Sequence, residues 1–164
     1  IIEILNICIE KNPAYIPAYA LTGRILFENG RYQESIKYLE KTVFMNPDDD
    51  MASVFLGISY FNTGNTHMAE KYLKRAYFLN PNSLMIILNL AFLYKSTGRY
   101  TEAIELYEKV IKINPDDLDA LNDLALCYAM IGEKAKAKNI WEEILKKNPD
   151  YQPAIMNLKI LQGE

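Results

Sequence analysis

Apolar residues recur at helical spacing in short blocks along the chain, and the blocks come in pairs. Ile87, Leu90 and Tyr94 lie three and four positions apart, which predicts a helix with one buried face. A second block of the same kind follows a break at Gly98, whose lack of a side chain permits the positive φ that often ends a helix. Each pair of blocks therefore predicts a hairpin of two helices.

The dipeptide Asn-Pro closes each hairpin and recurs with a period of 34 residues. It stands at Asn12-Pro13, Asn46-Pro47, Asn80-Pro81, Asn114-Pro115 and Asn148-Pro149. Proline disfavours a helical conformation in the residue before it and has no N–H to donate, so each second helix is predicted to end there. An unvarying period of this length predicts one helical hairpin stacked repeatedly into an all-α solenoid.

This register divides the chain into one solenoid domain with a partial unit at each end. We expect four full repeats, at residues 16–49, 50–83, 84–117 and 118–151. Residues 1–15 then form the second helix of a truncated upstream repeat, and residues 152–164 form a capping helix. Lys159 and Gln162 replace the small and aromatic residues of the other first helices, so we expect that face of the cap to meet water and the chain to end there naturally.

The first helix is apolar nearly all round. Ile2, Ile4, Ile7 and Ile9 surround it with large aliphatic side chains. Such a helix requires cover on more than one side, so we expect a further helix upstream of Ile1. The alternative is a homo-oligomer that covers the same surface.

Small residues occupy fixed positions where two helices must approach closely. The first helices hold Gly23, Gly57, Ala91 and Ala125 there, and the second helices hold Ser35, Ala69, Ala103 and Ala137. With these positions the chain resembles the tetratricopeptide repeat family. The second repeat carries the family motif at Leu56-Gly57, Tyr60, Ala69, Leu73, Ala76 and Pro81. Thr22 and Thr42 depart from it, where the family has leucine and alanine. The resemblance implies a right-handed superhelical α-solenoid of antiparallel helix hairpins that binds other proteins.

The face of each first helix opposite the packed side is predicted to line a concave groove. Its residues are apolar in the middle of the chain and polar toward the C-terminal end. We predict peptide binding by Arg24, Met51, Phe55, Ile58, Met85, Leu88, Asn89, Phe92, Asn122, Asp123 and Asn157. An exposed apolar patch of this kind usually marks an interaction site. The alternative is that curvature of the stack buries some groove residues, Val54 and Phe61 above all.

Asn89, Asp123 and Asn157 occupy one repeat position and form a partial row of polar side chains. Such a row can bind the backbone of an extended peptide. It is similar to the asparagine ladder in the repeats of O-linked N-acetylglucosamine transferase. The alternative is a polar surface without a ligand. The family's two-carboxylate clamp is absent, because Ala20 and Phe55 stand where it needs polar or basic side chains.

Composition narrows the partner class. The 164 residues carry a net charge of −3 and a pI near 5.3, which gives no footprint for nucleic acid or an anionic membrane. There is no membrane span and no signal peptide in the sequence given. Cys8 and Cys127 lie at opposite ends of the solenoid, so we expect two buried, unpaired thiols and a cytoplasmic protein.

No catalytic, metal or cofactor site is predicted. His67 is the only histidine and is expected at an exposed helix start, and Asp48-Asp49-Asp50 is interpreted as helix capping. Lys134, Lys136 and Lys138 are interpreted as a solvated helix face. The sequence thus predicts a non-enzymatic scaffold that holds a peptide segment of a partner protein. Two alternatives are a substrate-recruiting or regulatory region of a larger enzyme such as a glycosyltransferase, and a self-assembly scaffold.

Overall fold

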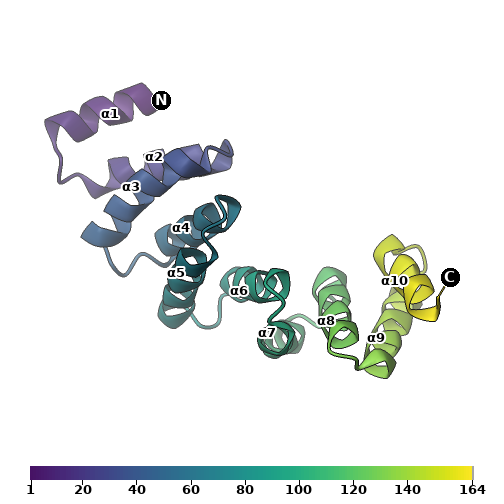
Figure 1. Ribbon diagram of the computed structural model, residues 1–164. Coiled ribbons are helices and arrows are strands. Elements are labelled where there is room, and N and C mark those ends of the chain that lie inside the picture. The colour runs from purple at the N-terminus through teal and green to yellow at the C-terminus, as the bar shows by residue number, and fades with distance from the viewer. Residues whose placement is uncertain (164) are drawn as a thin grey trace. The chain divides into compact units, whose positions relative to one another are not determined.

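The computed structural model describes the backbone of residues 1–163 and the side chains of all of these except Gln162. The described chain is all-α, as predicted (Figure 1). Its helices are α1 (Ile2–Lys11), α2 (Ile16–Glu28), α3 (Tyr32–Met45), α4 (Asp50–Asn62), α5 (Thr66–Leu79), α6 (Leu84–Ser96), α7 (Tyr100–Ile113), α8 (Leu118–Met130), α9 (Lys134–Lys147) and α10 (Gln152–Gln162). The expected role of the Gln162 side chain and the end of the cap at Glu164 lie outside the described residues.

The Asn-Pro dipeptides end the second helices as predicted. α3 stops at Met45, and the backbone N–H of Asn46 donates to the Thr42 carbonyl at 2.7 Å before Pro47 prevents a further turn. α1, α5, α7 and α9 end at the same repeat position. Gly30 has a φ of +72°, and the next three repeats have a glycine with positive φ at this turn.

Asp49 and Asp117 cap α4 and α8, the first helices of the repeats that follow them. Each accepts a hydrogen bond from a backbone N–H, Asp49 from Ala52 at 2.8 Å and Asp117 from Ala120 at 2.9 Å. These bonds satisfy donors that have no partner inside the helix, and the negative charge suits the positive end of the helix dipole. The interpretation of the aspartate run as helix capping is confirmed for Asp49.

The structure divides into two compact units, residues 1–89 and residues from Leu90 onward, with the boundary inside α6. In unit 1, consecutive helices from α1 to α5 pack against one another. An added Cβ at Gly23 would lie 2.7 Å from Leu39 Cγ, and one at Gly57 would lie 2.7 Å from Leu73 Cγ. Glycine at these two positions therefore lets each hairpin close on a buried leucine, as the small-residue positions predicted.

Unit 2 is built around Trp141. The indole is buried between α8, α9 and α10, with Leu121, Ala125, Ile144 and Ala154 in the same cluster. α7 packs on α8, and Tyr128 on α8 donates to Glu108 Oε1 on α7 at 2.6 Å. In unit 1 the same repeat positions are joined by Tyr60 and Glu40, at 2.5 Å. The packing contacts of the repeat are thus supplemented by a repeating polar one.

Three expectations about single residues and the first helix are tested by exposure. Cys127 is buried and unpaired, as predicted. Cys8 is only half-buried, so its predicted burial is wrong, and none of the described residues of α1 is buried. Ile4 and Ile7 of α1 are 65% and 49% exposed. His67 is exposed in the first turn of α5, as predicted. None of the described helices is both long and apolar enough to cross a membrane.

Candidate functional site

An open apolar pocket lies in unit 1 where α2 and α4 meet. Its volume is about 280 Å³. It is lined by Pro17, Ala20, Leu21, Arg24, Leu39, Asp49, Met51, Ala52 and Phe55. The structure therefore brings three predicted site residues, Arg24, Met51 and Phe55, together around one hollow.

The pocket exists because one repeat position holds its smallest residue. The repeat position of Ala20 is held in the later repeats by Val54, Leu88, Asn122 and Met156. Val54 is 1% exposed, so the side chain in this position is packed inward one repeat along. The expectation that Val54 lines the groove is wrong, and the alternative that stacking buries it is correct. At Ala20 the missing side chain leaves Leu39 as the floor of an open space.

Aromatic contacts hold one wall of the pocket in place. The rings of Phe55 on α4 and Phe27 on α2 have centroids 4.9 Å apart, and Phe27 in turn contacts Tyr32 edge-on at 5.7 Å. Such aromatic contacts add to the stability gained by burial alone. Phe55 is half-buried, with one side fixed against Phe27 and the other contributing to the pocket.

Two charged residues, Arg24 and Asp49, line the pocket, and they differ in how closely other groups of the protein bind them. Asp49 caps α4 through its bond from the Ala52 N–H. Arg24 makes only a loose pair with Glu28, 3.6 Å from Nε to Oε1, with half of its side chain exposed. The other three arginines of the chain bind more closely: Arg31 to Glu34 and Arg99 to Glu102 at 2.6 Å, and Arg75 to the Pro47 carbonyl at 2.7 Å.

The remaining predicted residues of unit 1 lie outside the pocket. Ile58 on α4 and Leu88 on α6 are half-buried, and Met85 is 41% exposed. The Asn89 amide nitrogen donates to the Met85 carbonyl one turn back at 2.7 Å. Ile58, Met85 and Leu88 are thus apolar and at least partly exposed, but they do not line the pocket.

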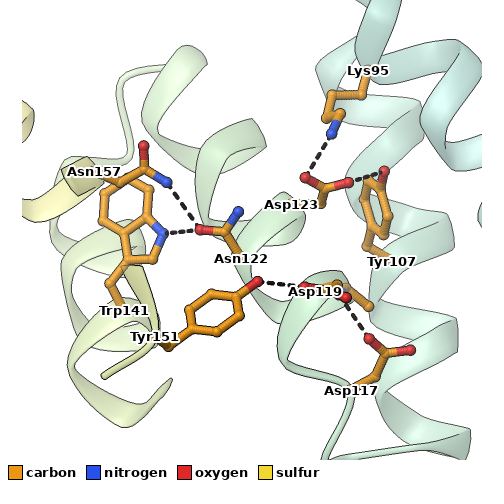
Figure 2. A network of polar contacts seen from close by, with 10 residues as sticks. Lys95, Tyr107, Asp117, Asp119, Asn122, Asp123, Trp141, Tyr151 and Asn157 are labelled. Atoms are coloured by element: carbon orange, nitrogen blue, oxygen red, sulfur yellow. Dashed lines mark hydrogen bonds and ion pairs between the residues drawn. The ribbon is translucent and has the colours of Figure 1, made fainter. Parts of the chain in front are cut away.

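The equivalent junction in unit 2, between α8 and α10, is filled by a polar network (Figure 2). Asn122 stands where unit 1 has Ala20, and its Oδ1 accepts from Trp141 Nε1 at 3.0 Å and from Asn157 Nδ2 at 2.9 Å. Tyr151 donates to Asp119 Oδ1 at 2.5 Å across the same junction. Asn122 is 8% exposed, so its predicted exposure to a ligand is wrong: the side chain joins its neighbours instead.

Asp123 is also bound by its neighbours. Lys95 Nζ lies 2.6 Å from Asp123 Oδ1, and the Tyr107 hydroxyl donates to Asp123 Oδ2 at 2.9 Å (Figure 2). Burial, with the adjacent carboxylate, raises the pKa of Tyr107 well above its usual range. The predicted row of peptide-binding polar side chains is therefore engaged within the protein at Asp123 and Asn157.

Phe92, one helical turn before Lys95, is 46% exposed, with the Lys95 ammonium 5.1 Å from its ring centre.

Two family models match the sequence. One is described as a tetratricopeptide repeat and matches residues 96–159, and the other, described as subunit 3 of the anaphase-promoting complex, or cyclosome, matches residues 28–110. The chain belongs to the tetratricopeptide repeat family. No curated protein matches it in a sequence comparison.

Solved tetratricopeptide repeat structures share the fold. A crystal structure of MamA is 26% identical, with a TM-score of 0.85, and the match covers 90% of this chain and 81% of that one. YrrB, described as a TPR protein with an unusual peptide-binding site, is 21% identical with a TM-score of 0.89, and the match covers 96% and 81%. A tetratricopeptide repeat protein from Parabacteroides merdae is 18% identical with a TM-score of 0.87, and the match covers 99% and 66%. The predicted solenoid fold class is thereby confirmed.

Repeat register explains which site residues of this tetratricopeptide repeat protein the sequence analysis missed. Leu39 and Trp141 hold the same position three repeats apart and lie at the junction in their units, yet neither is among the predicted site residues. Ala20 carried a signal, because it is the smallest residue in a position that is otherwise filled. Comparing side-chain size at one position across all repeats would have found the pocket.

Proposed function

We propose that this protein is a non-catalytic interaction module that binds a segment of a partner protein through the pocket between α2 and α4. The observation that carries the proposal is the contrast between the two junctions. The same repeat positions form an open apolar pocket in unit 1 and a network closed by hydrogen bonds in unit 2. A junction that the chain leaves unfilled has room for a side chain from elsewhere.

The size and lining of the pocket suit one bulky apolar side chain. A cavity of about 150 Å³ lined by aliphatic and aromatic groups holds a benzene molecule. The 280 Å³ between α2 and α4 therefore admits a leucine, methionine or phenylalanine side chain. Met51 adapts to ligands of different shape, because its unbranched thioether has three rotatable bonds. Burying one such anchor supplies about 1.5–3 kcal/mol.

The apolar surface beside the pocket supports binding of a segment rather than a single residue. Ile58 follows Phe55 on α4, and Met85 and Leu88 on α6 belong to the same unit. An interface usually gains most of its affinity from a few central anchors, and the contacts around them mainly exclude water. The peptide-binding site in YrrB is consistent with such a use of this fold.

Site-specific photo-crosslinking tests the proposal. A benzophenone amino acid would be placed at Met51 in the pocket and, as a matched control, at Ile160 on α10, which is apolar and 70% exposed. In native lysate, crosslinks to a partner protein should form from position 51 and fall when Ala20→Leu fills the pocket. Leucine already stands in this repeat position at Leu88, so the fold should accept it. Crosslinks that form equally from position 160, or that persist in the Ala20→Leu variant, would refute it.

A further inference from the structure

The charge at the pocket points to a more specific ligand, and this step rests on the proposed function. We infer that the pocket selects segments in which a bulky apolar side chain is accompanied by a carboxylate, with the apolar group over Leu39 and the carboxylate on Arg24. The occupant is thus a partner segment that is apolar and acidic together.

Arg24 has guanidinium donors to spare. Its Nε lies 3.6 Å from Glu28, whereas Arg31 makes two contacts with Glu34, at 2.6 and 2.7 Å. A guanidinium presents a planar set of donors that matches a carboxylate in two-point contact. A ligand carboxylate at Arg24 would therefore gain closer bonds than the present pair with Glu28.

Asp49 does not offer a comparable site for a cation. Its Oδ1 accepts from the Ala52 N–H at 2.8 Å, at the positive end of the α4 dipole, so its negative charge already has a partner in the fold. The other lining side chains are Pro17, Ala20, Leu21, Leu39, Met51, Ala52 and Phe55, which carry no charge and no hydrogen-bonding group. The charge left for a ligand is the positive one of Arg24, beside an apolar space.

Selection from a random 12-residue peptide display library on the whole chain tests the inference. Two controls accompany it: the Ala20→Leu variant, which fills the pocket, and Arg31→Gln, which removes an exposed arginine that does not line it. We expect the wild-type chain to enrich peptides that combine a leucine, methionine or phenylalanine with an aspartate or glutamate nearby. Arg24→Gln should weaken a selected peptide about three- to tenfold, the size of a partly exposed charged hydrogen bond, and Arg31→Gln should leave its affinity unchanged.

A charge exchange separates pairing from general electrostatics. Arg24→Glu should abolish binding of the acidic peptide, and replacing the peptide's carboxylate residue by lysine should restore it. Apolar peptides without acidic bias, with full affinity for Arg24→Gln, would overturn this inference and leave the proposed function standing. If no peptide is enriched over the Ala20→Leu control, both are overturned. Self-association of the chain that Ala20→Leu abolishes would assign the pocket to a second copy and overturn the acidic-segment assignment.

Discussion

The Trp141 indole nitrogen donates to Asn122 Oδ1 at 3.0 Å, and this bond closes in unit 2 the junction that Ala20 leaves open above Leu39 in unit 1. Asn122 and Trp141 hold the same repeat positions as Ala20 and Leu39, three periods of 34 residues further along the chain. This repeat position therefore distinguishes a junction filled by hydrogen-bonded side chains from one that stays open.

Removing the Asn122 side chain should destabilise unit 2. Asn122→Ala takes away the acceptor for the buried Trp141 N–H, and an unpaired buried donor costs about 1–3 kcal/mol. Urea unfolding followed by fluorescence reports this directly, because Trp141 is the only tryptophan. Asn157→Ala is the control and should cost less, since Trp141 then keeps its bond to Asn122. Equal losses in both variants would argue against the role given to the indole bond.

Thr22→Val should stabilise the protein by about 1 kcal/mol. The Thr22 hydroxyl is buried and has no hydrogen-bond partner in the structure, and valine keeps its shape without the unsatisfied group. Ser35→Ala provides the opposite case in the same unit, because Ser35 Oγ donates to the Gly23 carbonyl at 2.7 Å and the substitution removes this buried hydrogen bond. Calorimetry should show the melting temperature rise for the first variant and fall for the second.

Gly23→Ala should cost about 1–3 kcal/mol, because the new Cβ would lie 2.7 Å from Leu39 Cγ. A double-mutant cycle with Leu39→Ala isolates the cause. In the Leu39→Ala background the added methyl group has room, so Gly23→Ala should cost little or no further stability. Additive losses measured by denaturant unfolding would show that Gly23 is needed for some other reason.

The two thiols should differ in reactivity with pH. Burial raises the pKa of Cys127 to about 11, whereas an ordinary thiol titrates near 9. A raised pKa in the folded state stabilises the fold below pH 9, and that contribution is lost as the pH rises from 9 through 11. At pH 8 a disulfide reagent should therefore label the half-buried Cys8 first and Cys127 only as unit 2 opens. The slow phase of labelling should be absent from the Cys127→Ala variant. Fast labelling of both thiols in the folded protein would contradict this expectation.

The exposed face of α1 should promote self-association at high concentration. Ile4 and Ile7 are both large, apolar and about half or more exposed. We expect Ile4→Glu with Ile7→Glu to reduce the weight-average mass seen by sedimentation equilibrium without lowering helical circular dichroism. Phe44→Glu with Phe78→Glu, on α3 and α5, is a control with even more exposed apolar residues elsewhere in unit 1. A larger effect from the phenylalanine pair would place the contact on those helices instead.

Features set within one repeat could be predicted from the sequence, and features set between repeats could not. The helix ends at Asn46 and Asn114 and the close packing at Gly23 follow from the local chemistry of proline and glycine. A helical projection places Val54 and Asn122 on the inner face. It does not show what packs against each side chain, and in the structure Val54 is buried and Asn122 is bound by Asn157.

The separation of positions within the repeat has a consequence for how such a protein can change. Gly23, which lets the hairpin of α2 and α3 close on Leu39, does not line the pocket that Ala20 leaves open. A small residue at the equivalent position of another repeat could therefore open that junction instead, while the close contacts inside the hairpins stay as they are. The proposed binding specificity would in that sense be modular, gained, lost or relocated independently of the framework that carries it.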